Sequence, residues 1–161
     1  MIPDGVLRDS VSGTVHRMYE NGVAVGSGGG GTNTDRASNQ LVQFFLRAFF
    51  ANHPALLPRA PRRATGFLLD GKVGEQTVSG ILAFQRYFRN DGYPIAVDGR
   101  VSVAAGDMIP GARSRWTIHV LNLYYKEHAR TKADFPHLWL NPEIQAEAPE
   151  LAAELMSKQA R

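Results

Sequence analysis

The sequence predicts a mainly α-helical fold, and three observations lead to this expectation. Apolar residues recur at helical spacing over 35–51, 75–90 and 114–129. Asp-Gly dipeptides, which favour tight turns, stand before and after the second of these stretches, at 70–71 and 98–99. Hydrophobic residues make up 43% of the 161 residues, which is enough for a buried core at this length. We therefore expect a three-helix domain with two Asp-Gly loops.

The chain divides into three expected parts. The helical domain occupies residues 35–130. An N-terminal arm with a hairpin and a glycine-rich linker precedes it over 1–34, and a helical extension follows it over 131–161.

The arm contains a turn signal and a linker signal. Asn21-Gly22 lies between β-capable runs at 13–19 and 23–25, which indicates a type I′ hairpin. The glycine-rich stretch 26–31 is typical of a flexible linker. It lacks the Gly-Lys-Ser/Thr sequence of a phosphate-binding loop, and no buried strand precedes it, so we reject that function.

The first predicted helix, residues 35–51, has clear end signals. Asp35 or Ser38 can cap its start. His53-Pro54 ends it, because a residue before proline disfavours the helical conformation. Residues 52–69 are expected to form a long solvated loop. The alternative is a loop that contacts an anion through Arg59, Arg62 and Arg63.

The second and third helices carry similar signals. Glu75 lies in the first turn of the second helix, where the helix dipole favours a carboxylate, and Gly92 can end that helix in a left-handed conformation. Ser114 is the expected cap of the third helix. In the C-terminal extension, Asn141 should cap a last helix with Pro142 at its first position. Pro149 is expected to break or kink that helix.

The Asp-Gly loops belong to an internal repeat. In each copy an apolar residue precedes Asp-Gly, a second apolar residue follows two positions later, and a helix begins downstream. The aspartate should accept backbone N–H groups across the turn, and the glycine should supply a positive φ. On this basis the turn residues are Asp70, Gly71, Gly74, Thr77 and Gly99, and the second copy leads later to Thr117.

The repeat resembles the peptidoglycan-binding-like domain family, whose members have three helices and two Asp-Gly loops. The resemblance covers roughly residues 35–130. In the second copy Ser102 replaces a glycine, an insertion over 103–116 precedes Thr117, and the loop before Asp70 is longer than in the family. The residues that carry the match are Asp70-Gly71-Lys72-Val73-Gly74-Glu75-Gln76-Thr77, Phe84-Gln85, Gly92 and Val97-Asp98-Gly99.

The resemblance implies non-catalytic binding of bacterial cell-wall peptidoglycan, as glycan or peptide stem, in a shallow groove near the Asp-Gly loops. Tyr93 can stack on a sugar ring, and Arg100 can contact a carboxylate. Gln85 has two open interpretations, as a ligand contact or as a structural side chain that bonds a loop backbone. The expected ligand-binding residues are Gln85, Arg86, Tyr93, Asp98 and Arg100, with Tyr87 beside them.

The sequence offers no recognisable catalytic or metal-binding set. It has no cysteine, and its five histidines form no His-Glu-x-x-His motif. Asp70 and Asp98 are a pair of carboxylates, but an aspartate that accepts backbone N–H groups in a glycine turn is a poor general acid. His119 is expected at the edge of the core. We therefore expect no enzymatic activity, no cofactor and no metal.

Charge leaves two alternative functions open. Residues 35–115 hold eleven Lys and Arg against six Asp and Glu, whereas 134–161 hold two against five. The basic body could meet an anionic partner, or it could be ordinary surface charge. The acidic tail helix, the glycine-rich arm and the lack of a signal peptide suit a structural or adaptor component of a phage tail or secretion apparatus, contacting partners through 1–34 and 135–161. Nucleic-acid binding is a distant alternative, because no readout motif appears.

The N-terminus has neither the basic nor the apolar region of a signal peptide, and no stretch is apolar for long enough to span a membrane. We expect synthesis in the cytoplasm, with action at the cell wall after lysis or specialised secretion, or within a virion.

Overall fold

The computed structural model describes residues 4–8, 15–27, 35–57, 67–105 and 114–159. It is mainly helical, as the sequence predicts. The linker glycines at 28–31, the three loop arginines at 59, 62 and 63, and residues 106–113 lie outside the described residues. The helices are α1 (Arg36–Asn52), α2 (Glu75–Asn90), α3 (Thr117–His128), α4 (Pro142–Glu147) and α5 (Pro149–Gln159), and the strands are β1 (Asp4–Arg8), β2 (Val15–Tyr19), β3 (Val25–Gly26) and β4 (Arg100–Val101). Two 3₁₀ segments cover Pro54–Leu56 and Lys132–Leu140.

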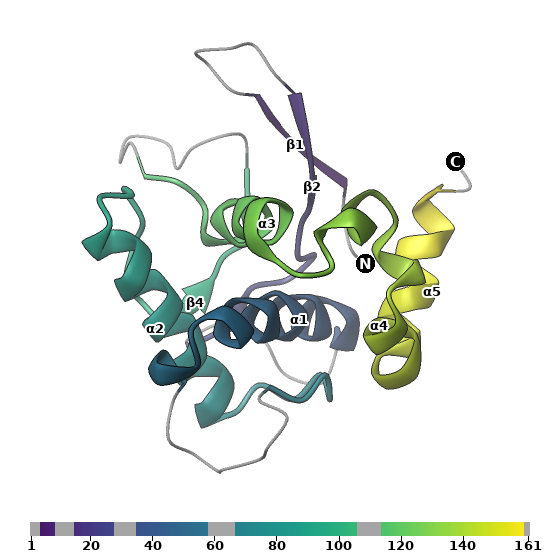
Figure 1. Ribbon diagram of the computed structural model, residues 1–161, viewed down its shortest axis with the longest axis horizontal. Coiled ribbons are helices and arrows are strands. Elements are labelled where there is room, and N and C mark those ends of the chain that lie inside the picture. Colours follow the sequence, from purple (N-terminus) through teal and green to yellow (C-terminus); the bar gives the residue numbers. More distant parts are fainter. Residues whose placement is uncertain (1–3, 9–14, 28–34, 58–66, 106–113, 160–161) are drawn as a thin grey trace.

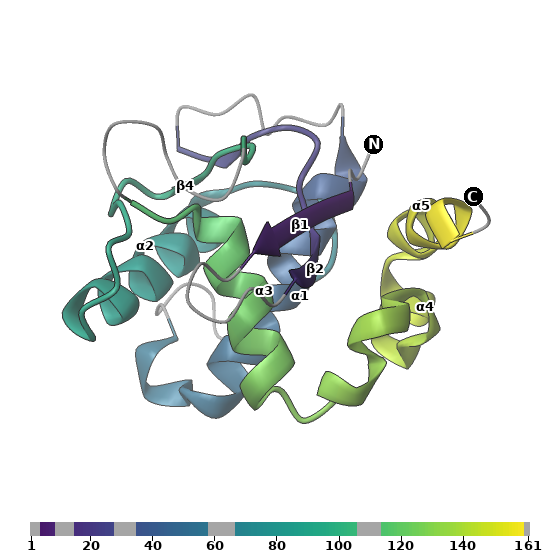
Figure 2. The same ribbon diagram turned by 90° about the horizontal axis from the view of Figure 1, so that it is seen from above.

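Helix α1 forms the centre of the fold. It packs against α2, α3 and α5, with α2 at one end of the molecule and the α4–α5 pair at the other (Figures 1 and 2). Every residue from Ala37 to Leu46 is buried, so α1 is covered on all sides and not only on the apolar face that periodicity predicts. A helix buried in this way must find partners for its polar side chains.

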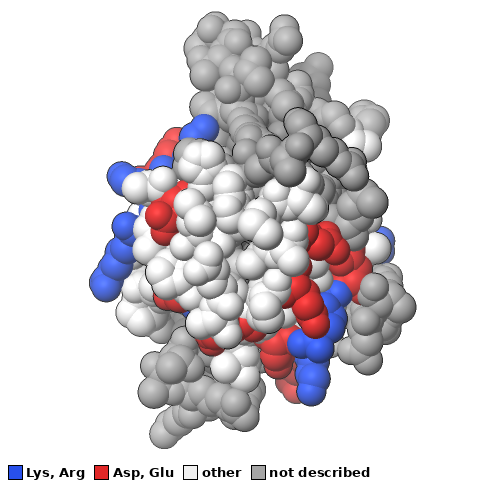
Figure 3. All heavy atoms as spheres, turned by 90° about the vertical axis from the view of Figure 1, so that its right-hand side faces the viewer, with Lys and Arg blue, Asp and Glu red and all other residues white. Residues whose placement is uncertain are grey.

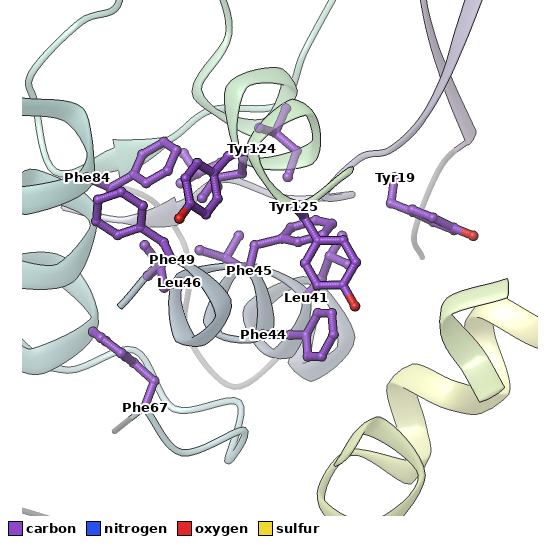
Figure 4. Close-up of a cluster of buried hydrophobic side chains, with 14 of the residues drawn as sticks. Tyr19, Leu41, Phe44, Phe45, Leu46, Phe49, Phe67, Phe84, Tyr124 and Tyr125 are labelled. Atoms are coloured by element: carbon purple, nitrogen blue, oxygen red, sulfur yellow. The ribbon is translucent and has the colours of Figure 1, made fainter. Parts of the chain in front are cut away.

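An aromatic core surrounds α1 (Figure 4). Phe49 packs edge-to-face on Phe84 and on Tyr124, with ring centroids 4.9 and 5.2 Å apart. Tyr125 of α3 lies between Phe44 and Phe45, at 5.2 and 5.6 Å. These contacts hold α2 and α3 to the same central helix.

The predicted helix boundaries are confirmed for α1 and α2. Asp35 is the N-cap of α1 and accepts the Ser38 N–H at 3.3 Å, while the chain leaves the helix at His53. The predicted second helix, 75–90, has the bounds of α2, and Gly92 adopts a φ of 89° after it.

The predicted cap of the third helix is wrong. Helix α3 begins at Thr117, and its N-cap is Trp116, not Ser114. The preceding chain is still extended, because the Arg115 N–H donates to the Pro94 carbonyl at 2.7 Å and Arg115 pairs with Ile95 in an isolated bridge. This pairing keeps Ser114 outside the helix.

The predicted hairpin at Asn21-Gly22 is also wrong, although the N-terminal arm does contain an antiparallel pair, β1 with β2. Strand β2 pairs with β1 and not with residues 23–25, and β3 pairs with β4. The reason is Asn21, which is fully buried and whose amide donates to the Val23 and Val101 carbonyls at 2.8 and 2.9 Å. The chain at Asn21 therefore runs into the domain instead of reversing as a type I′ turn.

Residues 18–27 belong to the domain rather than to a separate arm. Met18 and Val25 are fully buried. Asn122 of α3 binds both backbone groups of Tyr19, at 2.7 and 2.8 Å. Gly26, at φ 109°, lies against the second Asp-Gly loop, where a Cβ would meet the Gly99 carbonyl oxygen. The expected boundary at residue 34 therefore does not separate two cores.

His119 ties the same N-terminal stretch to α3. Its side chain is 1% exposed, and its Nε2 lies 2.8 Å from the Glu20 carboxylate. The sequence places this histidine at the edge of the core, and burial beside a single carboxylate is consistent with that expectation.

The C-terminal helices carry the predicted cap and break. The Asn141 side chain accepts the backbone N–H of Glu143 at 2.9 Å, and Pro142 opens α4. The helix ends at Glu147, and Pro149 opens α5. Leu151 and Leu155 of α5 are buried in the core that also contains Tyr19, so the C-terminal extension shares one core with the helical domain. Within the described residues, no helix has both the length and the apolar character needed to cross a bilayer.

Arg47 fastens α4 to α1. Its guanidinium donates to the Phe67 carbonyl at 2.7 Å and forms ion pairs with Glu143 and Glu147. Burial disfavours the charge of Arg47, but the hydrogen bonds and charges of the two glutamates outweigh it, and its pKa is raised. The hydrogen bond from Arg47 lowers the pKa of Glu147.

Removing the Glu147 carboxylate should flatten the acid dependence of stability. Because the Glu147 pKa is depressed in the folded protein, its stabilising effect is present above the ordinary glutamate pKa and is lost as pH falls through the depressed value. The urea midpoint of the natural protein should therefore fall more steeply between pH ~6 and ~3 than that of Glu147→Gln. Glu127→Gln, which removes an exposed carboxylate on α3, is the control; equal slopes for all three proteins would contradict this prediction.

Candidate functional site

The first Asp-Gly loop is held by a glutamine from α1. The Gln43 side-chain oxygen accepts the Gly71 N–H at 2.9 Å. Its amide nitrogen lies within hydrogen-bond distance of the Asp70 carboxylate at 3.1 Å, the Lys72 carbonyl at 2.9 Å and the Thr77 hydroxyl at 3.4 Å. The Asp70 carboxylate also accepts the Lys72 N–H at 2.9 Å. We call this set the first clamp.

The second Asp-Gly loop is held in the same way by a glutamine from α2. The Gln85 oxygen accepts the Asp98 and Gly99 N–H groups at 3.0 and 2.9 Å. Its nitrogen lies 3.0 Å from the Asp98 carboxylate and 3.0 Å from the Arg100 carbonyl. The Thr117 hydroxyl lies 3.1 Å from that nitrogen, at the start of α3. We call this set the second clamp.

The two clamps are structural copies of one unit. In each, Gly adopts a φ near 70°, at Gly71 and Gly99, and a threonine at the next helix start closes the set. Thr117 does so although the insertion over 103–116 separates it from the loop in sequence. The repeat in the sequence is therefore a repeat in space, and each clamp joins three successive parts of the chain: a helix, a loop and the start of the next helix.

Sequence reasoning missed Gln43. The available signal was its position: an apolar residue and Gln43 precede the first Asp-Gly loop, as Phe84 and Gln85 precede the second. The separation differs, 27 residues from Gln43 to Asp70 against 13 from Gln85 to Asp98, and this hid the correspondence. Two further polar residues of α1 bind the first loop, with Asn39 donating to the Gly71 carbonyl at 2.8 Å and Gln40 to the Leu69 carbonyl at 3.2 Å.

The expected ligand-binding residues do not form one surface. Gln85 is fully buried and its amide is used within the second clamp, which is the structural arrangement that the sequence left open. Asp98 is exposed, with one carboxylate oxygen accepting the Arg100 N–H at 3.0 Å. Arg100 is half-buried on β4. Arg86 follows Gln85 and therefore projects about 100° further around α2, away from the loop.

Arg86 and Tyr93 lie in two adjoining hollows that share Tyr87 and Asp91, and we call these hollows together the aromatic groove. The larger holds about 430 Å³ and is lined by Leu56, Ala83, Arg86, Tyr87, Asn90 and Asp91. The smaller holds about 120 Å³ and is lined by Tyr87, Phe88, Asp91, Tyr93, Val120, Leu123, Tyr124, Glu127 and His128.

Edge-to-face and tilted ring contacts support the aromatic groove. Phe88 packs at right angles to Tyr93, with centroids 5.3 Å apart, and edge-to-face on Tyr87 at 5.2 Å. His53, at the end of α1, lies 4.7 Å from Tyr87 on its other side. Burial raises the pKa of Tyr124, whose hydroxyl accepts a hydrogen bond from Asn52 at 3.0 Å. The Tyr124 phenol is therefore protonated at neutral pH and retains its own O–H to donate.

A third hollow, the loop hollow, adjoins the first clamp. It holds about 300 Å³, and its polar lining includes Asp70, Lys72, Glu75 and Gln76 around the start of α2. Of the expected turn residues, Gly74 and Thr77 also line it, with Gly74 as the N-cap of α2. The described residues contain no group of three or more side chains placed to hold a metal ion.

Comparison with known proteins adds no assignment. The chain matches no protein-family model, no curated protein and no solved structure. The clamps and the hollows of this chain are therefore the features from which its function is inferred.

Replacing either clamp glutamine should destabilise the fold. Gln43→Ala leaves the Gly71 N–H without its acceptor, and Gln85→Ala leaves the Asp98 and Gly99 N–H groups without theirs. Each group left unsatisfied costs about 1–3 kcal/mol. Urea unfolding should show a loss of stability for both variants. Gln145→Ala, at an exposed position of α4, is the matched control.

If Gln85→Ala kept the stability of the natural protein, the clamp would not be what holds the second loop. Gln85 would then be better interpreted as a ligand contact.

Proposed function

We propose that this protein binds bacterial cell-wall peptidoglycan without catalysing a reaction. The observation that carries the proposal is the pair of equivalent clamps. The residues that resemble the peptidoglycan-binding-like domain family, Asp70-Gly71 with Thr77 and Asp98-Gly99 with Gln85, are those that make the repeated hydrogen bonds.

Two hollows of the described surface have a chemistry suited to this polymer, and one of them adjoins the first clamp. Peptidoglycan presents sugar rings, amides and carboxylates. The loop hollow offers Lys72 and Gln76 beside the first clamp, and the aromatic groove offers ring faces with Arg86 at its rim. Both are open, shallow surfaces, which suits an extended polymer better than a small enclosed ligand.

The absence of catalysis is part of the proposal. In each clamp the aspartate oxygen accepts both a backbone N–H and the glutamine amide, at Asp70 and Asp98 alike. These bonds occupy the aspartate oxygen in holding its own turn, which favours a structural role over a catalytic one.

Sedimentation with purified sacculi tests the proposal. The natural protein should sediment with sacculi and remain in solution with cellulose, and soluble peptidoglycan fragments should compete for it. Arg86→Gln should weaken retention about two- to fivefold, the range for an exposed charged contact. Arg130→Gln, an exposed arginine after α3, is the matched control. A natural protein that stays in solution beside a sedimenting reference binder would refute the function.

A second candidate function is assembly into a larger particle, and the surface of the C-terminal helices favours it. Leu140 and Met156 are 56% and 57% exposed. Figure 3 views the side that carries α4 and α5: the centre of this face is uncharged, and acidic side chains lie at several points of its border. Exposed apolar side chains on a face with an uncharged centre and charged groups at its border are typical of a contact with another protein.

Point variants test this assembly surface better than truncation, because deleting residues 135–161 would remove core residues such as Leu151 and Leu155. Leu140→Asp and Met156→Asp should reduce co-purification with a partner complex while leaving the thermal midpoint within a few degrees. Val97→Asp, at an exposed apolar residue beside the second loop, is the control. Unchanged co-purification in both variants would count against an assembly contact on this face.

A further inference from the structure

In the aromatic groove, exposed and half-buried tyrosine faces meet charged and amide side chains. The C-terminal ends of α1, α2 and α3 converge there: His53 follows α1, Tyr87 and Asn90 close α2, and Tyr124 lies in the last turns of α3. The three helices therefore fix the groove walls relative to one another.

The tyrosine rings are held before any ligand arrives. Tyr93 is 36% exposed, and its ring is supported at right angles by Phe88. Tyr87 is half-buried and packs against Phe49 at 5.3 Å as well as against His53. Rings fixed in this way lose little conformational freedom when a flat apolar surface stacks on them.

The polar groups of the groove can form paired hydrogen bonds. The guanidinium of Arg86, the amide of Asn90 and the carboxylate of Asp91 line the larger hollow together. Each of these planar groups can bind two neighbouring hydroxyl or amide groups at once. Asp91 also lines the smaller hollow, where the Tyr124 hydroxyl can donate.

The charge of the groove argues against a polyanionic ligand. Among the described residues that line it, Arg86 is the one lysine or arginine, whereas Asp91 and Glu127 are both carboxylates, with His128 beside Glu127 at 3.5 Å. A nucleic acid or a phosphate-rich polymer needs several cations along its path. A neutral ligand with flat apolar faces and many hydroxyl groups matches this lining.

We propose that the aromatic groove binds the pyranose rings of a neutral amino-sugar glycan, with Tyr93 and Tyr87 as stacking faces and Arg86, Asn90 and Asp91 as hydrogen-bonding groups. This inference rests on the proposed peptidoglycan function and names the glycan strand, not the peptide stem, as the part recognised. The larger hollow, at about 430 Å³, falls within the usual size range of small-molecule sites.

Titration with a soluble β-1,4-linked tetramer of N-acetylglucosamine, followed by amide chemical shifts in NMR, tests the inference on the full chain. Shifts should concentrate on residues 83–93 and 120–128. Tyr93→Phe keeps the ring and should bind as the natural protein does. Tyr93→Leu keeps apolar packing on Phe88 but removes the ring face, and it should bind roughly three- to tenfold more weakly.

Leu140→Ala, an exposed apolar residue on another face, is the matched control and should leave tetramer binding unchanged. Asp91→Asn should weaken binding without changing the thermal midpoint, since its carboxylate is exposed.

The outcomes separate this inference from the function on which it rests. Retention on sacculi without tetramer binding, or with competition by a stem peptide alone, overturns the glycan assignment and leaves wall binding standing. Equal binding by Tyr93→Leu and Tyr93→Phe overturns the stacking role. Failure to bind either sacculi or tetramer removes both proposals.

Discussion

The burial of α1 on all sides is the constraint on which the rest of the structure depends. A central helix places apolar rings against α2 and α3, but it also takes polar side chains out of water, among them Asn39, Gln40 and Gln43. Their hydrogen-bonding capacity must then be met by protein groups. The first Asp-Gly loop meets it in part, because its carbonyls accept from the amides of Asn39, Gln40 and Gln43, and its Gly71 N–H donates to Gln43. Gln85 of α2 makes the equivalent hydrogen bonds to the second Asp-Gly loop. Each clamp thereby holds one helix, one loop and the start of the next helix together.

Much of the helical framework could be predicted from local signals. Asp35, Asn141, Pro142 and Pro149 act through the first turn of a helix, so their effect is visible in a short window of sequence. The failures concern longer-range pairing. Asn21 looks like a turn residue in its own window, yet Val101, 80 residues away, supplies its acceptor. Ser114 likewise loses its capping role to a backbone contact with the segment around Pro94, which no local pattern contains.

The candidate site could be predicted where local residue type determines the structure, and not where distant parts of the chain meet. The Asp-Gly turns and their positive-φ glycines follow from residue type alone. The partner that holds each loop comes from an earlier helix, at unequal distances along the chain, so Gln43 escaped notice and Gln85 kept two interpretations. The aromatic groove depended on three helix ends meeting, which periodicity does not specify. Tyr93 was identifiable as an aromatic residue after a helix, but its neighbours Tyr87, Asp91 and Tyr124 become a surface only once the helices are packed.

The role of Thr117 bears on how long the connection before α3 can be. The second clamp needs a threonine hydroxyl at the start of α3, and it obtains one across an insertion because the hydrogen bond specifies where the chain must return, not the path it takes. Closing a longer connection costs little additional entropy, since that cost grows only with the logarithm of length. The connection between β4 and the backbone contact of Arg115 is therefore a suitable graft point, where a reporter or a foreign epitope can be carried while β4 and the start of α3 stay anchored.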